Sequence, residues 1–219
     1  MRNRSLKQMI LMAIMAGIML KASAVAPGFY MGVMLGPATN SASSQQAQVE
    51  GTSTTPPTTV TATPKSQQFG SRIYMGYMIN RYAGFEGGAT YFSGIRYDSG
   101  NVPTCSSANS RVRDLEAVVK GVLPLRQFDV FGKAGVAVAY QTNGGAFNPT
   151  PDMPCGRSTY FNKFVPTFSL GASYDWTQNW VTDFTIQQVM VGGKVGSMTM
   201  FAVGVAYHFV DVYCGQFLC

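Results

Sequence analysis

The sequence predicts an all-β chain that folds into an eight-stranded antiparallel up-and-down transmembrane β-barrel, with long outer loops and short periplasmic turns. Three observations lead to this fold class. Residue character alternates with period two in eight segments of about ten residues, a strand periodicity and a length that crosses a bilayer at barrel tilt. One parity is apolar or aromatic and nearly free of charge, while the other is rich in Gly, Ala and Ser. The connections are long at one end and tight at the other.

The closing strand, Ser197–Phe209, illustrates the pattern. Its odd positions are nearly all apolar, and its even positions are small, flexible or polar, from Met198 to His208. A soluble, half-buried strand would carry charged or amide side chains on its second face. The wall of a narrow closed barrel instead needs an apolar outer face and a small-residue inner face.

Residues 1–24 have the pattern of a secretory signal peptide. Three of the first seven residues are basic, residues 9–20 are an apolar run too short to cross a bilayer as a helix, and Ala22-Ser23-Ala24 is a small-x-small cleavage site. This segment holds four basic residues and no acid, so its removal lowers the formal net charge from +6 to +2. The remaining chain has no basic stripe interleaved with aromatic residues, and we expect no nucleic-acid partner.

The expected strands begin with Gly28–Gly36, in which Phe29, Met31, Val33 and Leu35 share one face and three glycines give a thin inner face. The later segments alternate in the same way. They are Phe69–Asn80, Tyr82–Phe92, Arg111–Val122, Gln127–Tyr140, Lys163–Asp175, Trp180–Met190 and Ser197–Phe209.

Long loops are expected at about 37–68, 93–110 and 141–162, with tight turns at Asn80-Arg81, Leu123–Arg126 and Trp176–Asn179 and a short glycine-rich loop at 191–196. The first long loop contains TSTTPPTTVTATP, a composition that cannot bury enough apolar surface to fold alone, so we expect it to be flexible. In bacterial outer-membrane barrels the long loops lie outside and the turns lie in the periplasm.

The segments GFYMGVMLG, FEGGATYF, FGKAGVAVAY, TFSLGASYDWTQNW and FAVGVAYHF, in this order, resemble the strands of the small outer-membrane β-barrel family that includes the OmpA transmembrane domain. The resemblance covers residues 28–209. It implies one barrel domain over residues 25–209, a monomer, a place in the Gram-negative outer membrane and contact with the insertion machinery there. Family members generally end on the aromatic residue that this machinery reads, whereas here residues 210–219 follow Phe209 as a cysteine-bearing periplasmic tail.

If the aromatic parity faces lipid, the opposite parity places charges of both signs inside the barrel. Interior charges must pair to offset their desolvation, and side chains fill an eight-stranded barrel. Two interpretations are open: a salt-bridged plug that holds the barrel shut, or a narrow, weakly conducting pore whose charges set ion selectivity. The predicted interior set is Arg72, Glu86, Asp114, Glu116, Lys120, Asp129, Lys133, Asp183, Gln187 and His208.

No catalytic, cofactor or metal site is expected. Some small outer-membrane barrels are enzymes that act on lipid A near the outer leaflet, but His208, the only histidine, lies at the periplasmic end of the last strand. The cysteine spacing matches no zinc site, and G-x-S-x-G and phosphate-loop motifs are absent. A lipid A-modifying enzyme is therefore the third interpretation.

The four cysteines all lie in the exported part, where disulfides are the default. Cys105 and Cys155 fall in expected outer loops, while Cys214 and Cys219 follow the periplasmic end, across a core about 30 Å thick. We therefore expect Cys105 to pair with Cys155, and Cys214 with Cys219.

Five aromatic residues near the turn ends are expected to anchor the barrel at the membrane interface, in contact with outer-membrane lipid. They are Tyr82, Trp176, Trp180, Tyr207 and Phe209. The exposed loops offer a surface for a host or cell-surface ligand, as in an adhesin.

The favoured function is a structural or surface-interaction role in the outer membrane. The structural rival is a soluble eight-stranded barrel of the lipocalin kind, which would place the aromatic parity inside around a ligand. The Gly-, Ala- and Ser-rich parity would then form a sparsely charged outer surface, which argues against that rival.

Overall fold

The computed structural model describes residues 28–49, 58–98, 109–125, 127–144, 159–193 and 195–209. The expected signal peptide (1–24), the expected tail (210–219) and Cys105, Cys155, Cys214 and Cys219 lie outside the described residues, so these predictions stay predictions. In the described part of the chain, no helix is long and apolar enough to span a membrane.

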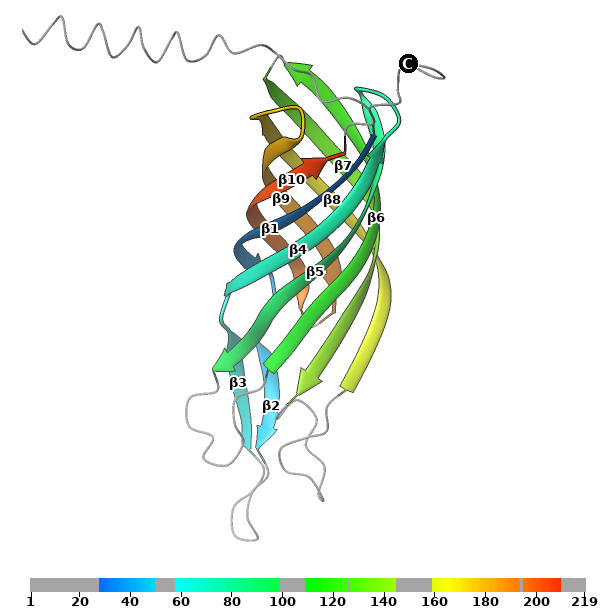
Figure 1. Cartoon of the computed structure of the whole chain (residues 1–219). Coiled ribbons are helices and arrows are strands. Elements are labelled where there is room, and N and C mark those ends of the chain that lie inside the picture. The colour runs from blue at the N-terminus through cyan, green and yellow to red at the C-terminus, as the bar shows by residue number, and fades with distance from the viewer. Residues whose placement is uncertain are drawn as a thin grey trace, which may run out of the picture.

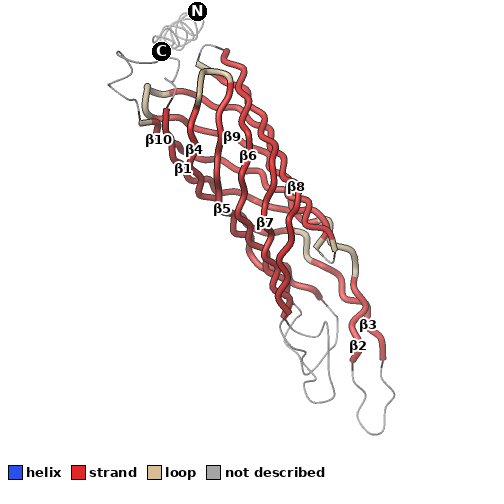
Figure 2. The backbone as a smooth tube through the Cα atoms, turned by 90° about the vertical axis from the view of Figure 1, so that its right-hand side faces the viewer, coloured by secondary structure: helices blue, strands red, loops and turns tan. Residues whose placement is uncertain are grey.

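Eight antiparallel strands close into a barrel, and two more form a hairpin at its loop end (Figures 1 and 2). The strand order is β2-β3-β5-β4-β1-β10-β9-β8-β7-β6, and pairing of β5 with β6 closes the ring. The predicted eight-stranded antiparallel barrel is therefore confirmed. The strands are β1 (Gly28–Asn40), β2 (Gln45–Val49), β3 (Thr58–Pro64), β4 (Gln67–Met78), β5 (Ala83–Asp98), β6 (Asn109–Leu125), β7 (Phe128–Gly144), β8 (Thr159–Asp175), β9 (Trp180–Gly192) and β10 (Gly196–His208).

Side chains alternate across the barrel wall. Along β4 every second residue from Gln68 to Met78 is buried, while Phe69, Ile73 and Tyr77 on the other parity are exposed. The same apolar exposure continues around the ring, which would be unfavourable over so large an area in water. The apolar face is therefore the outer, lipid-facing one, and the soluble rival is excluded.

Most strands run further toward the loop end than the sequence pattern predicted. β5 extends to Asp98, β7 extends to Gly144, and β8 already begins at Thr159. The alternation of apolar residues ends where lipid contact ends, but the backbone ladder continues because main-chain groups still need partners. The loops expected at 93–110 and 141–162 are shorter by these lengths.

The structure also differs from the expected flexible loop at 37–68. β2 pairs with β3, from Gln45 opposite Ala62 to Val49 opposite Thr58, and β3 reaches β5 through Thr63 and Pro64. Composition indicated a loop because the segment has few apolar residues. However, Thr and Val favour strands, and the extended β5 offers an unpaired edge on which a further strand can form.

The turn expected at Leu123–Arg126 is also shorter in the structure. Leu123, Pro124 and Leu125 belong to β6, with Pro124 opposite Asp129 in the register, so the connection shrinks to residues 126–127. Proline is tolerated here because it lies near the end of the strand.

The inner face of β1 is not thin, because large side chains alternate with its glycines. Tyr30 and Met34 are fully buried between Gly28, Gly32 and Gly36. The register places Tyr30 opposite Gly76, whose added Cβ would lie 2.5 Å from the Tyr30 ring. The opposite arrangement occurs at Gly32 of β1, which faces Tyr74 of β4. A Cβ added to Gly32 would lie 2.5 Å from the Tyr74 ring. Each tyrosine therefore lies over a glycine of the neighbouring strand.

Candidate functional site in the barrel interior

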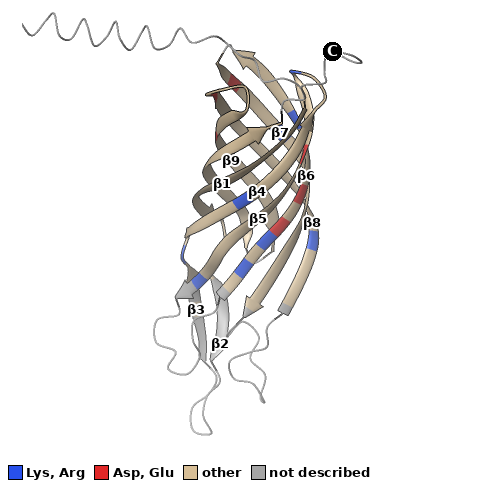
Figure 3. Cartoon of the chain, viewed as in Figure 1, with Lys and Arg blue, Asp and Glu red and all other residues tan. Residues whose placement is uncertain are grey.

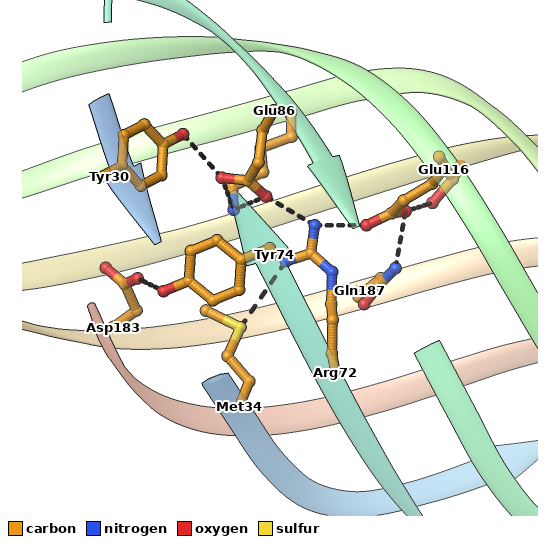
Figure 4. A network of polar contacts seen from close by, with 10 residues as sticks. Tyr30, Met34, Arg72, Tyr74, Glu86, Glu116, Asp183 and Gln187 are labelled. Atoms are coloured by element: carbon orange, nitrogen blue, oxygen red, sulfur yellow. Dashed lines mark hydrogen bonds and ion pairs between the residues drawn. The ribbon is translucent and has the colours of Figure 1, made fainter. Parts of the chain in front are cut away.

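The centre of the barrel holds a buried ion cluster built from four strands (Figure 4). Arg72 on β4 contacts Glu86 on β5, with Nη2 2.6 Å from Oε1, and the same Nη2 also pairs with Glu116 on β6. On β7, the Nζ of Lys133 donates to both carboxylate oxygens of Glu86, at 2.7 and 2.8 Å. These side chains are essentially inaccessible to solvent, so their charges interact in a low dielectric.

Hydrogen bonds from neutral side chains complete the cluster. The Tyr30 hydroxyl donates to Oε2 of Glu86 at 2.8 Å. Thr167 and the Gln187 amide both donate to Oε2 of Glu116, at 3.1 and 2.9 Å. Because each carboxylate accepts from both charged and neutral donors, the desolvation cost of burying it is offset.

Aromatic rings hold the cations from the other side. Lys120 lies 4.8 Å from the ring centroid of Tyr30 and 4.7 Å from that of Phe131. Lys133 also lies 4.9 Å from the Phe131 centroid. The guanidinium carbon of Arg72 lies 5.0 Å from the ring centroid of Tyr74. The Tyr74 hydroxyl donates a hydrogen bond to Asp183 on β9. These cation–π contacts add attraction where water is excluded.

The structure places nine of the ten predicted interior side chains in buried positions. The exception is Asp129, which is half-buried and lines a hollow of about 40 Å³ at the turn end together with Lys120 and His208. The His208 ring stacks on Tyr30, with centroids 4.9 Å apart and planes 9° from parallel. Asp114 lies toward the loop end, opposite Thr90 in the register.

Four participants were not predicted as part of the site: Tyr30, Tyr74, Phe131 and Thr167. Their parity marked them as inward-facing. Their residue types gave no sign of a role in the site, since aromatic residues on the outer parity anchor in lipid and Thr is common in any strand. The glycines Gly32 and Gly76 were the available signal, because a glycine on the inner face leaves room for a large side chain from the next strand.

The aromatic residues expected at the turn ends lie on the outside of the barrel, and three of them are in contact. Trp180 contacts Tyr207 at a centroid distance of 5.1 Å, and Tyr207 contacts Phe209 at 5.0 Å. Trp176 and Tyr82 are exposed at the neighbouring turns. Rings in this position fit the interface between hydrocarbon and headgroups, but their anchoring role stays a prediction.

The interior is suited to holding charge in place and has no grouping of metal ligands. Among the described residues, no three His, Cys, Asp or Glu side chains are arranged to hold a metal ion. The three basic residues Arg72, Lys120 and Lys133 are surrounded by carboxylates and rings, and every ion pair in the cluster joins residues on different strands. The cluster therefore links the wall across the lumen.

Fold and interior together define a small, closed outer-membrane β-barrel. The chain belongs to the outer membrane protein beta-barrel domain family, whose model matches residues 9–209. It is thus a protein of the outer membrane, as predicted.

Individual relatives agree with this assignment. Outer membrane protein A of Yersinia pseudotuberculosis is 30% identical over 149 residues, which cover 65% of this chain and 40% of the relative. An uncharacterized protein of Coxiella burnetii is 26% identical over 180 residues, covering 68% of this chain and 71% of the relative. The chain thus spans about two fifths of the OmpA relative.

Solved structures show the same fold at low sequence identity. Neisserial surface protein A aligns with a TM-score of 0.55 and 17% identity, covering 84% of this chain and 99% of that one. OprG from Pseudomonas aeruginosa aligns with a TM-score of 0.55 and 13% identity, covering 84% of this chain and 98% of that one.

Proposed function

We propose that this protein has a structural and surface-interaction role in the outer membrane, with a barrel that stays shut and outer segments that contact a host or cell-surface ligand. The observation that carries the closed barrel is the buried cluster of Arg72, Glu86, Glu116 and Lys133. An ion passing through would have to separate charges that are already paired and hydrogen-bonded, which costs several kcal/mol.

The outer segments support the interaction role. The β2–β3 hairpin extends past the barrel rim at the loop end, and β3 is tied to β5 (Figures 1 and 2). A projecting segment on a rigid scaffold is a common arrangement for recognition. Replacing residues 45–64 with a short Gly/Ser linker should leave a heat-modifiable barrel and abolish binding of intact cells to a ligand-bearing surface. Unchanged binding would place the interaction elsewhere.

A narrow, weakly conducting pore is the second candidate, favoured by one observation. Arg72 contacts both Glu86 and Glu116, so it can keep one carboxylate partner when it releases the other. Planar-bilayer recording separates the two candidates. The wild-type protein should show no stepwise conductance, and Glu86→Gln, which removes the shared acceptor of Arg72 and Lys133, should show more current. Steady wild-type steps at neutral pH would favour the pore.

We propose no catalytic role. His208 is stacked on Tyr30 near the periplasmic turns, far along the barrel from the outer leaflet where lipid A lies. Its backbone pairs with Asn179 in the neighbouring turn, so this end of β10 is held in place.

A further inference from the structure

The exposed charges of the described barrel are all basic. Among the residues whose side chains the structure describes, every Asp and Glu is buried except Asp129, which is half-buried. Figure 3 shows basic segments on β6 toward its loop end. The exposed basic residues among these side chains are Lys65, Arg81, Arg96, Arg111, Arg113 and Lys163. Of these six, only Arg81 lies at the periplasmic end, in a turn. The outer end of the barrel therefore presents positive charge that no exposed acid among the described side chains offsets.

An open hollow of about 900 Å³ lies on the outside of the wall, across β1, β4, β5 and β6 and on to β7 and β8. We call it the outer groove. Arg72 and Asp114 border it only through main chain, since their side chains are buried in the lumen. Its central outward-facing side chains are Leu35, Ser71, Ile73, Ala89, Tyr91 and Leu115.

The floor of the outer groove is low because two small residues, Ser71 and Ala89, lie between larger neighbours. Ser71 is opposite both Leu35 and Tyr91 in the register, and Ala89 is opposite both Ile73 and Leu115. The groove therefore runs over an apolar part of the wall that faces lipid, where a water-soluble ligand would not reside.

Two arginines border the loop-end side of the outer groove. Arg111 and Arg113 are exposed on β6, and neither has an ion-pair partner among the described residues. The Arg113 guanidinium lies 5.3 Å from the ring centroid of Tyr91. Tyr91 and Tyr140 are opposite Arg113 on either side, and two tyrosines in this row mark an outer aromatic girdle at headgroup height. An arginine is tolerated on the outer face at this depth, whereas at the bilayer midplane it costs about 2–4 kcal/mol.

We propose that the outer groove binds a phosphorylated, acylated glycolipid of the outer leaflet. Arg111 and Arg113 hold a phosphate group, which guanidinium groups bind through two parallel hydrogen bonds. An acyl chain of the same lipid lies over Ser71 and Ala89, between Leu35 and Leu115. The positive charge at headgroup height and the apolar hollow directly below it match the two ends of such a lipid.

The test measures lipid retention by the full barrel. The protein is reconstituted in phosphatidylcholine nanodiscs that contain a small fraction of diphosphoryl lipid A, and native mass spectrometry gives the dissociation constant for lipid A. Arg111→Gln with Arg113→Gln should weaken binding about tenfold or more, since each basic residue near a charged surface contributes about 1 kcal/mol. The matched control is Arg81→Gln, an exposed arginine that lies 5.9 Å from the Tyr82 ring at the opposite end of the barrel. It should bind like the wild type.

Two further arms separate the phosphate contact from the acyl contact. Removing both phosphates from lipid A should weaken wild-type binding to the level of the double variant and leave the double variant unchanged. Ala89→Phe, which fills the floor, should weaken binding of both lipid forms. Equal losses in Arg81→Gln and the double variant, or tight wild-type binding of the dephosphorylated lipid, would overturn the proposal. So would an Ala89→Phe variant that binds both lipids normally. A heat-modifiable band on a gel shows that each variant is folded.

Discussion

The inner and outer faces of this barrel wall are built from the same strands, yet they use their residues differently. On the outer face, apolar side chains such as Val203 and Leu170 are exposed, and their environment is lipid rather than a particular partner residue. On the inner face, Glu86 alone accepts from Arg72, Lys133 and Tyr30. The outer face depends on side-chain character and depth in the membrane, whereas the inner face depends on particular pairs of residues.

This difference explains how each face responds to change. Lipid adapts to the shape of an apolar side chain, so volume changes outside should cost little, and introduced charge should cost much. The packed interior cannot adapt to either, because its central charges are already paired and the rings of Tyr30 and Tyr74 lie over glycines. Variants matched across the wall should therefore separate the two faces.

The largest effect is expected from Glu86→Gln. It leaves Arg72 with Glu116 and takes from Lys133 the one carboxylate with which it forms an ion pair among the described residues, so a buried charge is uncompensated. Breaking a buried ion pair by removing one partner typically costs about 3–5 kcal/mol. Urea-dependent unfolding in lipid vesicles, followed by tryptophan fluorescence, measures the free energy of unfolding.

A second variant checks the cause of that loss. Glu86→Gln combined with Lys133→Met removes both charges, and it should recover part of the stability lost in the single variant. If Glu86→Gln costs less than about 1 kcal/mol, or if the double variant is no more stable than the single one, the cluster does not stabilise the barrel through charge pairing.

The same contrast explains what the sequence could predict. The inward parity of Arg72, Glu86 and Lys133 follows from the side-chain period of two, which one strand reveals by itself. Their pairing depends on the stagger between strands, and no periodicity within a strand contains that information. Tyr30 could not be assigned for the same reason, because its role depends on Gly76 lying opposite it.

The β2–β3 hairpin marks a second limit of sequence reasoning. Its sequence is rich in Thr and Gln and has no large apolar or aromatic residue, so the signal that identified the barrel strands is weak there. They pair because the backbone of β5 continues past the apolar band and leaves an edge for Thr63 and Pro64. An edge of this kind is a property of the assembled sheet rather than of the segment that joins it.

An intermediate effect is expected from charge placed on the outer face. Leu170 on β8 is 69% exposed and lies four residues from Tyr174 at the turn end, well within the apolar band. Leu170→Arg should lower the free energy of unfolding in vesicles by about 2–4 kcal/mol. The control is Tyr160→Arg, on the same strand and the same outer face but at the loop end, where the cost should fall to about 0–1 kcal/mol. Equal costs at the two sites would show that the band is not placed as proposed.

The smallest effect is expected from a single methyl group added to one face or the other. Gly76→Ala places a Cβ 2.5 Å from the Tyr30 ring and 2.7 Å from the Phe85 carbonyl oxygen. Such overpacking should cost about 1–3 kcal/mol.

Gly121→Ala is the matched control, because it lies on the outer face of β6 and its added Cβ would come no closer than 4.0 Å to another atom. In the same vesicle assay this variant should be as stable as the wild type or slightly more so, since alanine is favoured over glycine in a strand interior. If both variants lose the same stability, the tyrosine-over-glycine pairs are not tightly packed, and the inner face tolerates change as the outer face does.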